Sequence, residues 1–285
     1  MKYNVIVATH HKTGTVWMDG VFKAIARDLD VECIDFDAQP ERLAQTREQG
    51  RPFILLSTSS RFGTHADLLD RPDVRILHVI RDPRDVIISA MHYHKKSGES
   101  WLHEPIPGYD NAITYQRRLR TLPTRYHQYV FEMDHSSSGT VHDMQGWRYD
   151  RPNCFEARYE ALRQDGDLAY WTRISTFLGF EEKELLVCRQ RFWDNSLFGG
   201  LSRLGNKHVR NGDTHQWKRE FNVGLAYAFL ARFPRALQEL RYEPDHRWIL
   251  GLSRAEPSEL ASSLARIANF GLQPVFALSR SLSLF

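Results

Sequence analysis

The fold of this chain follows from one segment near its start, Asn4-Val5-Ile6-Val7-Ala8-Thr9-His10-His11-Lys12-Thr13-Gly14-Thr15-Val16-Trp17. The apolar, β-branched run at the beginning of the segment is typical of a buried strand, and it stops at polar residues. From Trp17 onward, apolar residues recur at the spacing of one helix face, through Val21, Phe22 and Ile25. The segment therefore predicts a strand, a tight loop and an amphipathic helix.

The loop of this segment has the chemistry of an anion-binding site. A helix N-terminus carries unpaired backbone N–H groups and the positive end of a dipole, Gly14 lets the backbone approach an oxyanion closely, and Lys12 adds a mobile charge. It is not a Walker loop, which needs two glycines around four residues before Lys-Ser/Thr, because Lys12 precedes the only glycine here. A plain strand-to-helix turn with a solvated lysine is the simpler alternative for the segment taken alone.

Composition and charge limit the class of protein. The 285 residues are 42% hydrophobic and 26% charged, as in an ordinary soluble globular protein of one domain, with or without an appendage. A net charge of +3 is too mild to indicate a nucleic-acid partner. The three cysteines, Cys33, Cys154 and Cys188, lack metal-ligand spacing, so we expect buried reduced thiols and no metal.

The sequence also predicts a cytoplasmic location. The first apolar run, Val5–Ala8, is too short for a signal peptide and leads straight into the loop. No stretch approaches the roughly 18 apolar residues of a membrane span.

Two further runs, Phe53–Ser57 and Val74–Ile80, are mostly apolar, as in strands buried on both faces; their polar residues are Ser57, Arg75 and His78. Because such strands alternate with helical segments, the sequence predicts an α/β fold with a central parallel β-sheet flanked by helices. Ligands bind such sheets at the carboxyl ends of the strands, and Lys12, Thr58 and Arg81 all follow such ends.

Weaker sequence patterns predict the remaining elements of the chain. In chain order they predict a short strand at 31–36, a functional loop at 97–109, a turn at 136–139, a fourth strand at 153–160, a mobile basic loop at 194–214 and a helix at 217–240. We expect residues 1–250 to form the main domain and residues 251–285 a C-terminal helical extension.

The segment 11–17 is similar to P-K-S-G-T-T-W, the 5′-phosphosulfate loop of sulfotransferases that use 3′-phosphoadenosine 5′-phosphosulfate (PAPS), of the cytosolic Sulfotransfer type. By this match five residues would bind the donor: Lys12 at the bridging oxygen of the sulfate, Thr13, Gly14 and Thr15 at the 5′-phosphate, and Trp17 at the adenine. His11 stands where the family has proline. Val16 replaces a threonine, so one hydroxyl contact is lost.

Two more motifs resemble the same family. The segment 79–93 is similar to the 3′-phosphate motif R-N-P-K-D-V-x-V-S-x-Y-H, with Arg81 and Ser89 on its phosphate-contacting positions; an arginine fork suits a phosphate dianion. The segment 210–217 looks like R-x-G-x-x-G-x-W, and His215 replaces the second glycine. This match implies that three residues close over the 3′-phosphate: Arg210, Asn211 and Gly212. Tyr159 matches a Y-E-D-L segment whose tyrosine packs near the adenine.

The resemblance covers residues 5 to about 245 and implies a P-loop-NTPase-like three-layer sandwich and a PAPS-dependent sulfotransferase, with the desulfated nucleotide PAP as product. Charge grows on the leaving 5′-phosphate as the S–O bond breaks, and Lys12 would meet it. In the family the base is a histidine just after the strand that corresponds to Phe53–Ser57, in a K-T-H segment, but the ungapped match puts Thr58 there. We favour His65 as base, with His11, His94 and Glu99 as other candidates.

Two other functions stay open from the sequence. A catalytically silent nucleotide-binding or scaffold protein of the same fold would keep Arg81 and Arg210 but lack the base. A nucleotide-dependent kinase would need the Walker spacing and a carboxylate for Mg²⁺, neither of which is present. For the main hypothesis we expect a small-molecule acceptor with a hydroxyl or amine, of apolar or aromatic character. The final helix leaves open packing on the domain, a homodimer or a membrane surface.

Overall fold

The computed structural model describes residues 1–109, 112–203 and 212–269. They form two compact units, which are described separately. The first unit contains Met1–Arg81 and His142–Thr214, and the second contains Asp82–Val141 and His215–Phe285.

The first unit is built on a five-stranded sheet in which every pairing is parallel, in the order β2-β3-β1-β4-β5. The strands are β1 (Asn4–Ala8), β2 (Glu32–Asp35), β3 (Phe53–Ser57), β4 (Val74–Ile80) and β5 (Cys154–Arg158). In the centre, Ile6 lies between Leu55 and Ile76. The chain builds the sheet on one side of β1 and then on the other, which makes the carboxyl end of β1 a topological switch point. The predicted α/β class is confirmed.

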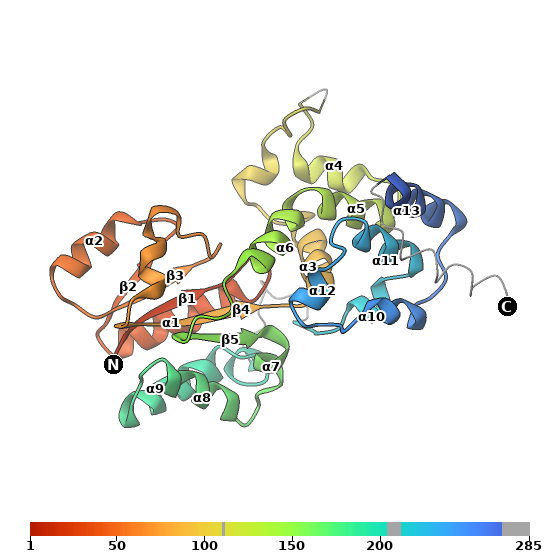
Figure 1. The fold of residues 1–285 in the computed structure, drawn as a ribbon. Coiled ribbons are helices and arrows are strands. Elements are labelled where there is room, and N and C mark those ends of the chain that lie inside the picture. The colour runs from red at the N-terminus through yellow and green to blue at the C-terminus, as the bar shows by residue number, and fades with distance from the viewer. Residues whose placement is uncertain (110–111, 204–211, 270–285) are drawn as a thin grey trace. The chain divides into compact units, whose positions relative to one another are not determined.

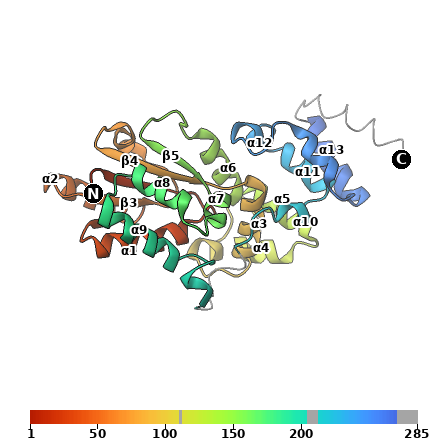
Figure 2. The same ribbon diagram turned by 90° about the horizontal axis from the view of Figure 1, so that it is seen from below.

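Helices cover both faces of this sheet (Figures 1 and 2). They are α1 (Thr15–Asp28), α2 (Glu41–Glu48), η1 (Gly63–Asp70), α7 (Tyr159–Gln164), α8 (Ala169–Phe177), α9 (Glu182–Asp194) and η4 (Gly200–Arg203). Strand residues alternate between the two faces: Val7 packs with α1, α8 and α9, whereas Ile6 packs with α2 and η1. This arrangement is the predicted three-layer sandwich, and it explains why β1 and β3 are continuously apolar.

The second unit is helical. It contains α3 (Pro83–His94), η2 (Ser100–His103), α4 (Tyr115–Thr121), α5 (Arg125–Asp134), α10 (Trp217–Glu220), α11 (Val223–Leu230), α12 (Ala236–Glu239), η5 (His246–Gly251) and α13 (Pro257–Asn269). Helix α6 (Ser136–Gly146) begins in this unit and ends in the first. No helix among the described residues is long and apolar enough to cross a bilayer.

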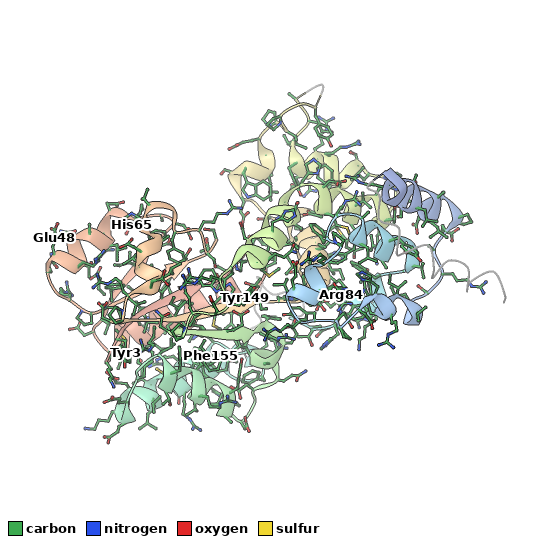
Figure 3. The ribbon with its side chains drawn as sticks, viewed as in Figure 1. Tyr3, Glu48, His65, Arg84, Tyr149 and Phe155 are labelled. Carbon is green, nitrogen blue, oxygen red and sulfur yellow. The ribbon has the colours of Figure 1, made fainter. Side chains whose placement is uncertain are left out.

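A buried arginine fixes the start of α3 (Figure 3). Arg84 is 1% exposed and donates to Asp82 at 2.7 Å and to Glu243 at 2.7 Å. Its guanidinium lies 3.5 Å from the ring centroid of Trp217. Two carboxylates and an aromatic face thus compensate the buried charge, so that α3 is tied to the C-terminal part of its unit.

Two sequence expectations are wrong in detail. The predicted turn at 136–139 is the first turn of α6, whose Ser137 and Val141 are fully buried, so packing outweighs the weak helix propensity of the serine run. The predicted helix at 217–240 is three short helices. Asn222 breaks it by accepting from the Leu225 amide at 2.8 Å as the N-cap of α11.

Helix α13 packs on α11. Ser263 donates to the Gly224 carbonyl at 2.8 Å, and Asn222 donates to Glu259 at 2.8 Å. Leu260 and Leu264 lie against a small apolar cluster on α11. The predicted domain boundary at residue 250 stays a prediction, but the ordinary packing role of the final helix has direct support in these contacts.

Candidate nucleotide-binding site

The loop between β1 and α1 has an unusual backbone. Lys12 has φ of 67°, in the left-handed region that non-glycine residues rarely adopt, and Gly14, the N-cap of α1, has φ of 109°. No side chain caps α1, and its first turn holds no acidic residue. The loop thus offers first-turn N–H groups and the positive end of the dipole to an anion.

His10 anchors this loop through its main chain. Its carbonyl accepts from the Thr13 amide at 3.0 Å, from the Thr13 hydroxyl at 2.9 Å and from the Thr15 hydroxyl at 2.9 Å. Its amide donates to the Thr13 hydroxyl at 2.9 Å. Thr9 donates to the Thr15 hydroxyl at 3.0 Å. Both hydroxyls that are expected near the phosphate are therefore part of the loop's own hydrogen-bond network.

Arg81 connects this loop to a second one. It follows β4 and is 4% exposed, and it donates to the Lys12 carbonyl at 3.2 Å and to the Asp213 carbonyl at 3.0 Å. Its guanidinium lies 4.4 Å from the ring centroid of Tyr159. A buried, permanently charged fork is thereby held next to the anion-binding loop.

Tyr159, the first residue of α7, contacts both loops. Its hydroxyl donates to the Gly212 carbonyl at 3.1 Å, and its ring meets the ring of Trp17 edge-on at 6.0 Å. A Cβ atom on Gly14 would lie 3.0 Å from the Tyr159 ring. Together with the positive φ, this close approach requires a glycine at position 14.

The sequence profile of the family described as "Sulfotransferase domain" matches residues 2–241. The chain belongs to this family. Among curated proteins, no sequence is significantly similar to the chain.

A solved sulfotransferase structure shares the fold. Mouse sulfotransferase SULT7A1, complexed with PAP, is 13% identical with a TM-score of 0.50, and the match covers 87% of this chain and 88% of that one. Retinol dehydratase in complex with androsterone and inactive cofactor PAP is 17% identical with a TM-score of 0.43, over 82% of this chain and 80% of that one. At this level of identity the first match supports the fold, and the second carries no further argument.

The structure brings together most of the nucleotide residues expected of a sulfotransferase. The first unit contains Lys12, Thr13, Gly14, Thr15, Trp17, Arg81, Tyr159 and Gly212. Ser89 lies on α3 in the second unit. Arg210 and Asn211 lie outside the described residues.

The candidate bases of this sulfotransferase lie in different surroundings. His65, labelled in Figure 3, is half-buried on η1 with its ring edge-on to Phe36 at 5.6 Å. Thr58, at the family histidine's position, donates through its hydroxyl to Asp37 at 2.8 Å. In the second unit, His94 shares a 2.7 Å hydrogen bond with Glu132, and both are fully buried.

Glu99, also in the second unit, accepts from the hydroxyl of Tyr93 and from the Trp101 indole, each at 2.7 Å. His11 is half-buried next to Lys12 in the loop. His65 stays a prediction, as do the alternatives.

Sequence reasoning missed two features of this site. Arg163 lies four residues after Tyr159, one helical turn on, and donates to the Gly212 carbonyl at 2.8 Å. His10 and His78 are 1% and 0% exposed and share a 2.8 Å hydrogen bond. A signal for the pair was His78 inside an otherwise apolar strand, because a buried strand tolerates such a side chain only when its polar atoms are paired.

No cluster of three or more histidine, cysteine, aspartate or glutamate side chains in the described part of the chain could hold a metal ion. All three cysteines are free; Cys188 is buried, and burial raises the pKa of the half-buried Cys33 thiol to about 11.

Proposed function

We propose that this member of the sulfotransferase family transfers the sulfuryl group of PAPS to a hydroxyl or amine of a small-molecule acceptor. The observation that carries the proposal is the uncapped, left-handed turn at Lys12 and Gly14, with Arg81 and Tyr159 held against it. Membership of the family and the PAP complex of the mouse sulfotransferase support the choice of nucleotide.

The residues of the loop suit the donor. A Cβ at position 14 would press on the Tyr159 ring, so a glycine is needed to keep the turn that leads into the first-turn amides, the groups that would bind an oxyanion. PAPS supplies an activated sulfuryl group on a phosphate leaving group. Lys12 would stabilise the charge that develops on that phosphate, and Thr15 would add a neutral donor.

We assign recognition of the 3′-phosphate to Arg81, Ser89, Arg210, Asn211 and Gly212. Arg81 supports this role because its planar guanidinium is buried and donates to two carbonyls. Trp17 and Tyr159 offer aromatic surfaces for the adenine. The base that accepts the proton of the acceptor is assigned to His65.

For the acceptor we propose a small apolar or aromatic molecule. As walls of the acceptor site we propose the loop at 101–109 and the aromatic stretch Tyr126, Tyr129 and Phe131 on α5. The proposal includes neither a nucleic-acid partner nor a metal, and it locates the protein in the cytoplasm. A homodimer remains open.

The test is transfer of radiolabelled sulfate from PAPS to a panel of phenols, aliphatic alcohols and amines, in wild type and His65→Asn. Transfer to at least one acceptor class, with strong loss in His65→Asn, is the expected result. Transfer that is unaffected in His65→Asn would remove His65 as the base but keep the activity.

A catalytically silent nucleotide-binding protein is the second candidate, favoured by one observation. Thr58, at the position of the family base, is occupied by its bonds to Asp37. PAP binding without transfer to any acceptor in the panel would favour this candidate over the enzyme.

A further inference from the structure

Two buried histidines and a half-buried glutamate form a hydrogen-bonded chain across the three neighbouring strands β1, β4 and β5 of the first unit, with His10 just past the end of β1. Glu156 on β5 lies 2.6 Å from Nδ1 of His78 on β4, and Nε2 of His78 lies 2.8 Å from Nε2 of His10 after β1. The register pairs His78 with Glu156 on one side and with Ala8 on the other, so the sheet itself aligns the three groups.

The chemistry of the three groups determines which nitrogen atoms in this hydrogen-bonded chain carry protons. A carboxylate accepts, so Nδ1 of His78 carries a proton and donates to Glu156. Nε2 of His78 is then a bare lone pair that accepts from Nε2–H of His10. Nδ1 of His10 is left unprotonated, and it has no hydrogen-bond partner among the described residues. Both imidazoles are thus neutral and each has one fixed tautomer.

The ring of His78 is fixed in orientation as well. Trp147 stacks on it at 4.1 Å between ring centroids, and Tyr149, labelled in Figure 3, meets it edge-on at 5.8 Å. A ring clamped between an aromatic face and a carboxylate can hold the imidazole of His10 in one position.

His10 passes this fixed position on to the anion-binding loop. Its carbonyl and amide form four hydrogen bonds with Thr13 and Thr15. These two threonines flank Gly14, and Thr13 directly follows Lys12. A shift of the His10 backbone would therefore shift the amides and hydroxyls at the start of α1.

We propose that His10 is a positioning residue for the nucleotide loop, held by the His78–Glu156 chain so that its main chain keeps the loop in its anion-binding geometry. The inference rests on the proposed function for the identity of the ligand. Because His10 is 1% exposed, it acts through the loop and not by contact with an acceptor.

The hydrogen bond between the two imidazoles requires that Nε2 of His10 carries a proton and that Nε2 of His78 does not. A second proton, on Nε2 of His78, would set N–H against N–H across the 2.8 Å bond and break it. The groups that bear on the pair's protonation are Arg61 after β3, Arg151 before β5, Glu156 on β5, and the two histidines themselves, with the phenol of Tyr149 and the thiol of Cys154 nearby. The two arginines and burial oppose a second proton, whereas Glu156 favours it.

The test uses the full-length protein with substitutions at His10, and with a control substitution at Asn4, at the start of the strand β1 that leads to His10. His10→Phe keeps a ring but loses the donor, whereas His10→Gln restores an N–H near the Nε2 position. The control is Asn4→Ala, which removes hydrogen bonds to the Phe53 amide and to Asp73 at the start of β1. Four quantities are measured: amide exchange across residues 11–15 without nucleotide, the dissociation constant of PAP, the imidazole nitrogen chemical shifts, and turnover with an acceptor from the panel above.

For His10→Phe we expect faster exchange in the loop and PAP binding weakened about five- to tenfold, the scale of one buried hydrogen bond. His10→Gln should recover most of both. Asn4→Ala should lower the urea midpoint yet leave loop exchange and PAP affinity unchanged. In wild type, the nitrogen shifts should show the Nδ1–H tautomer for His78 and the Nε2–H tautomer for His10.

Loop exchange in His10→Phe equal to wild type, or equally faster in Asn4→Ala, would overturn the inference. So would a His10→Gln variant that binds PAP normally but has lost turnover, since Nδ1 would then act in the chemistry itself. A wild type that does not bind PAP would refute the proposed nucleotide instead, while loop exchange and tautomers would still decide the role of His10.

Discussion

Lys12 combines two features that rarely occur in one residue. Its backbone has φ of 67°, a conformation that costs about 1–3 kcal/mol outside glycine, and its carbonyl accepts from Arg81. The left-handed turn that follows a strand and precedes a helix N-terminus aims successive amides at one point. The strain is thus located where the loop has to present donors to an anion.

If Lys12 meets charge that develops only as the sulfate leaves, Lys12→Ala should lower turnover about 10²–10³-fold while PAP affinity falls much less. Lys12→Arg should not fully restore turnover, because a planar fork replaces a compact charge. Single-turnover rates and PAP dissociation constants for both variants check this. Equal losses of rate and affinity would make Lys12 a binding residue only.

Gly14 offers a second prediction at the same scale, with a matched control. Gly14→Ala must adopt φ of 109° and bring a Cβ to 3.0 Å from Tyr159, whereas Gly50→Ala meets a φ of 62° with nothing within 4 Å. Gly50→Ala should therefore cost about 1 kcal/mol of unfolding free energy, and Gly14→Ala more.

Only Gly14→Ala should also weaken PAP binding. Urea unfolding and calorimetry measure the two effects. If the two substitutions had the same effect on both quantities, the Tyr159 contact would have no role in shaping the loop.

At the scale of elements, the strands were predictable and several helices were not. Runs such as Phe53–Ser57 place apolar side chains on both faces of a strand, which is the pattern of a strand inside a parallel sheet with helices on both sides. Their place in such a sheet therefore follows from the sequence. Helix α6 begins with three serines, which favour helix only weakly, and its Val141 and Met144 are fully buried. The helix therefore depends on tertiary packing, which the local sequence does not reveal.

The features of the candidate site also divide into those that the sequence predicts and those that only the fold reveals. Motif spacing predicts that Lys12, Gly14 and Arg81 lie near the same edge of the sheet, because each comes after the carboxyl end of a central strand, and their role in nucleotide binding stays a prediction. It could not show the contact of Arg163 with Gly212 or the pairing of His10 with His78, since both join residues that only the fold brings together.

The pairing of β1 with β4 through the two histidines leads to a pH prediction. Burial, the neighbouring His78 and Arg61 lower the pKa of His10 well below its ordinary 6.5, and burial and Arg151 lower the pKa of His78 to about 3. As the pH falls below 6.5, the unfolded chain therefore takes up protons that the folded chain does not, and the unfolding free energy decreases.

Between pH 7.5 and 5.5, one such histidine contributes a loss of about 1.4 kcal/mol. Wild type should thus lose about that much more unfolding free energy over this interval than His10→Gln, in which the titrating group is gone. Urea unfolding at both pH values measures the difference, and contributions shared by the two proteins cancel. Parallel pH dependence in the two proteins would mean that His10 is protonated in the folded state.

At the scale of the whole molecule, nucleotide binding should appear as a selective rise in stability. The first unit holds Lys12, Gly14, Arg81 and Tyr159 in one compact body, so a ligand of this set stabilises that body against unfolding. PAP at about 100 times its dissociation constant adds about 2.7 kcal/mol. In a chain of this size that is a rise of about 5–10 °C in the corresponding Tm.

AMP, which lacks the 3′-phosphate, provides the discriminating comparison. A charge-assisted contact from Arg81 to that phosphate is worth roughly 1.5–3 kcal/mol, so AMP at the same concentration should add only about 0.3–1.3 kcal/mol. In Arg81→Ala the difference between the two shifts in scanning calorimetry should become clearly smaller than in wild type, because one of the residues that bind the 3′-phosphate is gone. Equal shifts already in wild type would show that the 3′-phosphate is not recognised, and the assignment of Arg81 would fall with it.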